Sequence, residues 1–182
     1  MQPLPDLVTL LRDIHWALVG GLALRAYMPE RMTLDIDILI HDRDAGAVRA
    51  AFESAGYHVT GQLRIGGFTV QNPAPNSMPV DVLTRDDPWL EEAFAHPSYD
   101  SAGYPVLGRP YLVLIKLQAG RTQDLADTQR LLALTPLAER TAIRALVEQF
   151  NPELVEDYDS LITLADLEFG LPQGNSGAGQ DR

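Results

Sequence analysis

Hydrophobic positions follow two different periodicities along this chain. Up to residue 108, short apolar or alternating runs are separated by Gly, Pro and Asn, a pattern typical of β-strands and tight turns. Over residues 109–169 the apolar positions recur every three to four residues, which is typical of amphipathic helices. We therefore expect an α/β core over 1–108 and a helical region over 109–169 that packs on it. Residues 170–182 are Gly- and Gln-rich and are predicted to be a disordered tail.

The boundaries of these runs predict individual elements. The expected strands are β-branched or alternating and lie at 15–19, 33–40, 59–63, 68–71, 80–83 and 104–107. The expected helices lie at 4–13, 22–27, 44–55, 88–95, 111–119, 124–134, 137–150 and 152–168; Pro29 and Gly56 mark the ends of the second and third. Gly56 suits the left-handed residue that follows a helix. The predicted fold class is α+β, a small mixed sheet with helices packed on it and a C-terminal helical segment.

Composition narrows the class of protein. With 46% hydrophobic and 21% charged residues the chain is of ordinary globular composition, and having no cysteine it cannot form disulfides or thiolate metal sites. There is no basic leader and no apolar run of about 20 residues, so we expect a cytoplasmic protein without membrane contact. The net charge of −11 disfavours a broad nucleic-acid-binding face. A nucleotide remains compatible with this charge because bound divalent ions reverse the local sign.

Two acids in the most convincing strand, 33–40, carry the candidate chemistry. Because side chains alternate along a strand, Asp35 and Asp37 should share one face while Leu34 and Ile36 enter a core on the other. Two close carboxylates repel each other unless a cation lies between them, and oxygen ligands suit Mg²⁺ or Mn²⁺. An edge strand with two solvated acids would give the same pattern, so this motif alone does not decide.

Two further features point to the same site. Gly20 and Gly21 lie between an apolar run and a helical stretch, where glycine lets backbone amides face a phosphate. Asp81 is an acid within the apolar strand 80–83, and a carboxylate in such surroundings usually has a cation or a donor beside it. A tight turn needed for packing would also explain the glycines, and a position at the end of a strand would explain Asp81.

Gly-Gly, then Asp-x-Asp, then one acid on a later strand is the pattern of the DNA polymerase beta-like nucleotidyltransferase superfamily. The segment VGGLALRAYMPERMTLDIDILI resembles minimal members of it, most closely the abortive-infection type IV toxins and their relatives. Arg31 and Thr33 are similar to the first two positions of an R-x-T-x-D-x-D motif in that group, which implies a role in nucleotide binding. The resemblance is strong over 15–40 and fair over 79–84 and 111–131.

The resemblance implies a metal-dependent enzyme that moves a nucleoside monophosphate from an NTP to a hydroxyl group, with pyrophosphate leaving. It implies that Asp35 and Asp37 bind both catalytic metals, Mg²⁺ or Mn²⁺, and that Asp81 binds the metal that activates the hydroxyl. Gly20 and Gly21 would hold the triphosphate. The acceptor would be tRNA, a protein side chain or a small molecule, and a cognate toxin or antitoxin protein would be a partner.

A second resemblance lies in the helical region. KLQAGRTQD is similar to a K-x-x-A-x-x-x-R motif whose lysine reaches the β- and γ-phosphates, although Arg121 falls two positions early. Lys116 is the only lysine of the chain and stands in an apolar run, where a buried ammonium needs an anion; a lysine that snorkels at a helix edge is the alternative. Asp127 shares a helix face with Asp124 and is a candidate for orienting Lys116 or an incoming base. Arg25 is expected at the surface.

Two other functions fit the same residues. A protein of this fold with NTP affinity but little turnover would act as a regulatory or antitoxin-type module. A glycosyltransferase also uses a D-x-D motif to hold a metal, but it leaves the upstream glycines without a role. Pyrophosphate release distinguishes the enzyme from the module, and preference for a plain NTP over a sugar nucleotide distinguishes it from the glycosyltransferase.

Overall fold

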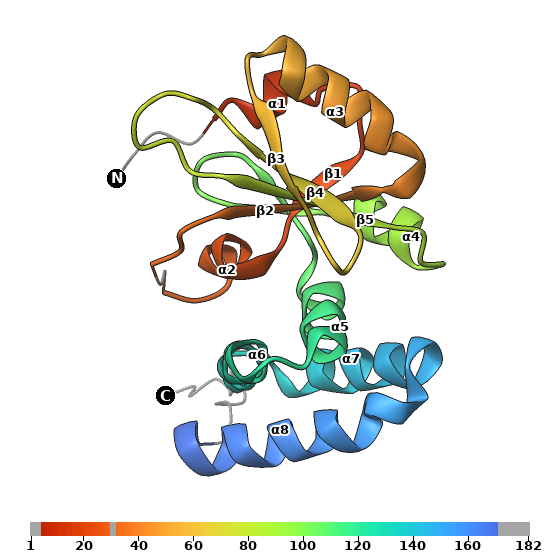
Figure 1. Ribbon diagram of the computed structural model, residues 1–182. Helices are drawn as coiled ribbons and strands as arrows, with labels where there is room; N and C mark the ends of the chain where they lie inside the picture. The colour runs from red at the N-terminus through yellow and green to blue at the C-terminus, as the bar shows by residue number, and fades with distance from the viewer. Residues whose placement is uncertain (1–4, 30–31, 171–182) are drawn as a thin grey trace, which may run out of the picture. The chain divides into compact units, whose positions relative to one another are not determined.

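The computed structural model describes residues 5–29 and 32–170, and its contacts divide the chain into two compact units, Met1–Gly108 and Arg109–Arg182. Figure 1 shows strands and helices in the first unit and helices in the second. Across the described residues, no helix combines the length and apolar character that crossing a bilayer requires. The predicted tail, apart from Gly170, lies outside the described residues.

A seven-stranded mixed sheet forms the first unit, with the strand order β3-β4-β5-β2-β1-β7-β6. Neighbouring strands are antiparallel except for the parallel pairs β2 with β5 and β1 with β7. The strands are β1 (Trp16–Leu18), β2 (Ile36–His41), β3 (His58–Gln62), β4 (Gly67–Gln71), β5 (Val80–Arg85), β6 (Ser98–Tyr99) and β7 (Pro105–Val106). The predicted α+β class with a mixed sheet is confirmed.

Helices lie on both sides of this sheet. They are α1 (Leu7–Leu10), α2 (Gly20–Ala23), α3 (Ala45–Ser54) and α4 (Leu90–Ala95), with 3₁₀ turns at Leu24–Ala26 and Asp42–Asp44. Figure 1 shows α1 and α3 on one side of the sheet and α2 on the other. α3 ends before Gly56, whose φ of +82° is the left-handed conformation expected there.

At the start of the central strands burial alternates, so that one face is apolar there and the other carries acids. Ile36 and Ile38 on β2 are fully buried, as are Val80 and Val82 on β5, which are their register partners. The residues between them are only half-buried and project to the opposite face. The apolar row anchors the sheet in the core and leaves the other face for acids.

The start of β2 differs from the prediction. The strand begins at Ile36 instead of residue 33, and Leu34 is 80% exposed instead of entering the core. Pairing with β5 begins at Ile36 and Val80, and the Ile36 amide donates to the Pro79 carbonyl at 3.0 Å. Pro79 has no N–H with which to extend the ladder, so Asp35 lies in a bend directly before the strand.

Other expected elements differ mainly in length. The predicted helix 22–27 begins earlier, at Gly20, and changes to a 3₁₀ turn after Ala23. The helix predicted for 4–13 covers only Leu7–Leu10 of the described residues. The two-residue strand β6 was not predicted, because two residues carry no periodicity.

The second unit consists of helices whose buried faces meet around aliphatic side chains. The helices are α5 (Arg109–Ala119), α6 (Thr122–Ala133), α7 (Leu137–Phe150) and α8 (Val155–Phe169), with a 3₁₀ turn at Pro152–Leu154. Polar contacts also join them: the Arg140 guanidinium on α7 donates to the half-buried Asp166 on α8 at 2.7 Å, and the buried Tyr158 hydroxyl donates to the Arg140 carbonyl at 2.7 Å.

Candidate active site

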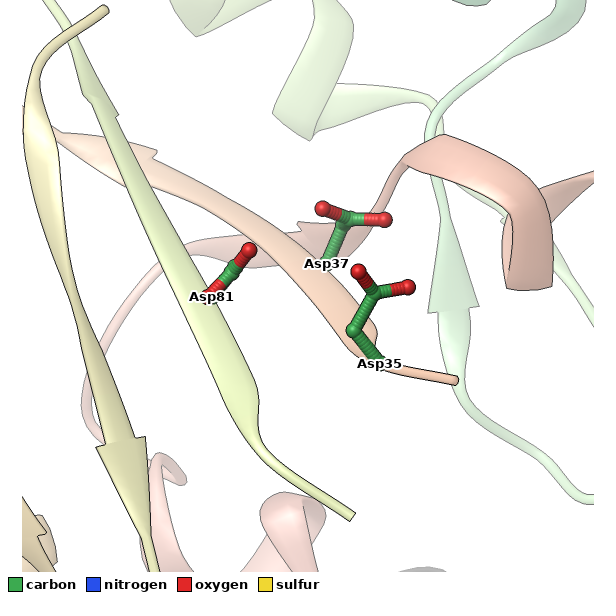
Figure 2. Close-up of side chains that lie close together, drawn as sticks. All are labelled: Asp35, Asp37 and Asp81. Carbon is green, nitrogen blue, oxygen red and sulfur yellow. The ribbon is translucent and has the colours of Figure 1, made fainter. Parts of the chain in front are cut away.

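The structure brings together the three acids that the sequence singled out. Asp37 on β2 and Asp81 on β5 are register partners across two parallel strands, and Asp35 lies just before β2. One carboxylate oxygen from each residue lies within 4.8 Å of the others. Figure 2 shows the three side chains projecting to the same side of these strands. We refer to Asp35, Asp37 and Asp81 as the acidic triad.

The triad suits a hard divalent cation. Its three half-buried carboxylates are oxygen donors of the kind that Mg²⁺ and Mn²⁺ prefer. Like charges at this spacing repel each other, and a cation between them removes that repulsion. Among the described residues this is the one group of three or more candidate ligands that meets the spacing needed for a metal ion.

The first glycine of the Gly-Gly pair is fitted to Asp37. The Val19 amide donates to the Asp37 carbonyl at 2.9 Å, so the hydrogen bonding between β1 and β2 continues one residue beyond the end of β1. Gly20 follows with φ of +61°, a conformation that L side chains rarely adopt. A Cβ on Gly20 would lie 1.9 Å from Oδ2 of Asp37, so only glycine leaves room for this carboxylate. Gly21 lies in the first turn of α2.

Asp81 has a donor that the sequence did not reveal. The Thr69 hydroxyl on β4 donates to Oδ1 of Asp81 at 2.6 Å, and the two residues are register partners in antiparallel strands. The alternation at 68–71 predicted a strand, but it gave no information about which strand lies beside it. The cross-strand neighbour of Asp81 therefore became visible only in the structure.

The other predicted nucleotide-binding residues have different surroundings. Thr33 is half-buried in the irregular segment before β2. Arg31 lies outside the described residues.

Arg25, expected at the surface, is instead part of an ion pair: its Nε donates to Asp100 at 2.8 Å, and the Asp100 side chain is fully buried. The reason is that Asp100 also accepts the amides of the turn before β7, so the pair joins that turn to the segment after α2.

Lys116 is buried within the second unit and paired with two acids. Its ammonium on α5 donates to Asp124 at 3.1 Å and to Asp127 at 2.9 Å, both on α6. The Lys116 side chain is 3% exposed. Arg121 also donates to Asp124, at 2.6 Å, and Gln123 donates to Asp127 at 3.0 Å. The snorkelling alternative is wrong, because the ammonium itself is enclosed. The phosphate contact stays a prediction.

Comparison with known proteins identifies the family. A family model described as nucleotidyl transferase AbiEii toxin, type IV TA system, matches residues 4–173. No curated protein matches the chain.

Solved structures share the fold. The antibiotic-resistance factor ANT(2'')-Ia, in a solution structure, is 16% identical with a TM-score of 0.54, over 85% of this chain and 97% of that chain. The lincosamide antibiotic adenylyltransferase LnuA, in a lincomycin-bound crystal structure, is 15% identical with a TM-score of 0.51, over 71% of this chain and 92% of that chain. At these identities the likeness establishes a common fold. Together with the family match it confirms the resemblance seen in the sequence: the chain belongs to the AbiEii family of nucleotidyltransferase toxins of type IV toxin–antitoxin systems.

Proposed function

We propose that this nucleotidyltransferase moves a nucleoside monophosphate from an NTP to a hydroxyl acceptor, dependent on Mg²⁺ or Mn²⁺, with pyrophosphate leaving. The observation that carries the proposal is the acidic triad, whose oxygens lie within 4.8 Å of one another. Family membership fixes the class of reaction and removes the glycosyltransferase alternative.

Asp35, Asp37 and Asp81 would hold the divalent cation. When bound, the cation would supply a lowered pKa for the attacking hydroxyl and charge neutralisation for the pyrophosphate. The chain itself contributes a rigid frame, because Asp37 and Asp81 stand opposite each other on paired strands. Asp35, in the bend before β2, supplies the third carboxylate of the triad.

The triphosphate would lie against the backbone at Gly20 and Gly21, beside the triad. Gly20 lies in van der Waals proximity to the Asp37 carboxylate, so an anion bound there would be close to a cation held by Asp37. Arg31 and Thr33 precede the triad in the chain and would contact the nucleotide. For Lys116 and Asp127 the sequence resemblance alone supports a role in nucleotide binding; within the second unit the two side chains are paired at 2.9 Å.

The acceptor is a hydroxyl group of tRNA, of a protein or of a small molecule. LnuA, described as an adenylyltransferase and bound to lincomycin, is a precedent on this fold for a small acceptor. The description of the family as toxins favours an acceptor that the cell requires. A cognate antitoxin protein would be the partner that counters this activity.

Label transfer tests the proposal. The purified chain would be incubated with each α-labelled NTP, Mg²⁺ or Mn²⁺, and tRNA, protein or small-molecule pools. We expect transfer of label and release of pyrophosphate, both lost on chelation. Asp37→Asn should reduce turnover more than about 100-fold, the upper end of what changes around a metal ligand cause. Asp42→Asn is the matched control, because Asp42 is an exposed acid in the 3₁₀ turn directly after β2.

The same assay distinguishes the catalytically weak alternative. Calorimetric binding of Mg·NTP without pyrophosphate release from any acceptor pool would support an NTP-binding module. Neither binding nor label transfer by the wild-type chain would reject both versions.

A further inference from the structure

Thr69 and the triad belong to one continuous row across three strands. Asp37 on β2 is the register partner of Asp81 on β5, and Asp81 is in turn the partner of Thr69 on β4. The neighbours of Thr69 in its strand, Phe68 and Val70, are buried on the opposite face. The Thr69 hydroxyl therefore projects to the face on which Figure 2 shows the triad.

We propose that Thr69 is a positioning residue for Asp81, holding its carboxylate in the orientation that completes the metal site. This inference rests on the proposed function, since it assigns Asp81 to a bound cation. The hydroxyl donates to Oδ1 at 2.6 Å, a short bond of the kind that charged acceptors make. A carboxylate offers about four lone-pair positions, so one donor leaves capacity for a cation.

The surroundings of Thr69 direct its hydroxyl to Asp81. The residue beyond it in the row is Gly61 on β3, which has no side chain to compete for the hydroxyl. Even a Cβ added at Gly61 would lie 4.0 Å from Thr69 Oγ1, at ordinary van der Waals distance. Threonine is also stiff at χ1, so the hydroxyl orientation costs little further entropy.

A fixed orientation of the Asp81 carboxylate matters because the three carboxylates of the triad repel one another when no cation is bound. An unrestrained Asp81 would rotate away from Asp35 and Asp37 until the metal arrives. Partners of metal ligands typically change metal affinity or activity by about 10- to 100-fold when removed. We expect an effect of this size from loss of the Thr69 hydroxyl.

The test is Mn²⁺ binding to the full-length chain by calorimetry, with wild type, Asp81→Asn, Thr69→Val, Thr69→Ser and Thr60→Val. Thr69→Val replaces the hydroxyl with a methyl group, and Thr69→Ser keeps the hydroxyl. Thr60→Val is the matched control, because its hydroxyl lies on the neighbouring strand and donates to the backbone carbonyl of Thr69 at 3.4 Å. Circular dichroism verifies that each variant folds, and Thr69→Ala replaces Thr69→Val if the latter does not.

We expect Thr69→Val to weaken Mn²⁺ binding about 10- to 100-fold, while Thr69→Ser and Thr60→Val bind like wild type. In turnover assays, Thr69→Val should need correspondingly more metal for half-maximal rate and recover at saturating metal. Wild-type affinity in Thr69→Val would overturn the inference, as would equal weakening in Thr69→Val and Thr69→Ser. If Asp81→Asn also binds like wild type, the failure lies in the proposed metal site itself.

Discussion

Gly20 and Asp37 lie so close that a single added carbon would not fit between them: a Cβ on Gly20 would stand 1.9 Å from Oδ2 of Asp37. The contact links the glycine bend at the end of β1 to the acidic triad. The first glycine of the pair is thus required by the position of a carboxylate as well as by its left-handed φ of +61°.

Gly20→Ala should therefore disable the site. The alanine would be strained by about 1–2 kcal/mol in this conformation and would push Asp37 aside. Because a displacement of about 1 Å at a catalytic group can reduce turnover on the order of 100-fold, we expect a loss of that size in the label-transfer assay. Gly46→Ala is the matched control: Gly46 lies in α3 with nothing within 4 Å, and alanine there should stabilise by roughly 0.5–1 kcal/mol. Normal turnover in Gly20→Ala would contradict the geometry.

Asp35→Asn should stabilise the metal-free protein while weakening its response to metal. Removing one of three mutually repelling charges should raise the free energy of unfolding by about 1 kcal/mol, the order expected near solvent. Added Mg²⁺ or Mn²⁺ should then raise the melting temperature of wild type but much less that of the variant, and EDTA should reverse the wild-type shift. Asp86→Asn, at an exposed acid outside the triad, controls for net charge. A variant less stable than wild type without metal would argue that the three charges do not repel.

The central strands and the triad were predictable because their patterns are local. The run 33–40 alternates and is β-branched, and 80–83 is an apolar run with one acid, so both predicted strands. That Asp35, Asp37 and Asp81 converge depends on β2 and β5 being neighbours, which the family resemblance implied and periodicity alone did not.

What the sequence could not reveal depends on partners far along the chain. Thr69 looks like any β-branched strand residue until its register with Asp81 is known. The strand start was misplaced because Leu34 continues the alternation in sequence while Pro79 ends the hydrogen-bonded ladder in space. Lys116 was correctly suspected of needing an anion, but only the structure shows that both Asp124 and Asp127 supply it.

Lys116→Met should destabilise the second unit strongly. It would leave Asp127, which is fully buried, and the nearly buried Asp124 without the ammonium that lies 2.9–3.1 Å from them. Breaking a buried ion pair from one side typically costs about 3–5 kcal/mol, which urea denaturation would measure. Adding Asp124→Asn and Asp127→Asn to Lys116→Met should recover part of that loss.

Arg144→Met provides the contrast for this prediction. Arg144 makes a comparable contact with Asp159 at 2.9 Å, but both side chains are exposed to solvent. Exposed ion pairs contribute little to the free energy of unfolding, so Arg144→Met should hardly alter the urea midpoint. If Lys116→Met and Arg144→Met lowered the free energy of unfolding equally, burial would not be the reason why the Lys116 contacts stabilise the fold.

Stability should fall in alkali because of Tyr158. Burial raises the pKa of its phenol above the usual value of about 10, so the fold favours the neutral form. The native state then binds more protons than the unfolded state, and the stabilisation, complete below about pH 10, is lost as pH rises through the folded pKa. Tyr158→Phe also loses the hydroxyl bond to the Arg140 carbonyl. We expect the free energy of unfolding of Tyr158→Phe to be about 1 kcal/mol below that of wild type near pH 8. As the pH rises further, the free energy of unfolding of the variant should fall less than that of wild type. An alkaline slope as steep as that of wild type would contradict this assignment.

The most direct test of the acidic triad as a metal site is anomalous diffraction from crystals grown with Mn²⁺ and a non-hydrolysable NTP analogue. We expect a manganese peak at coordination distance, about 2.1 Å, from carboxylate oxygens of Asp35, Asp37 and Asp81, next to the phosphates. A manganese peak elsewhere in the protein, or none at these three carboxylates, would contradict it.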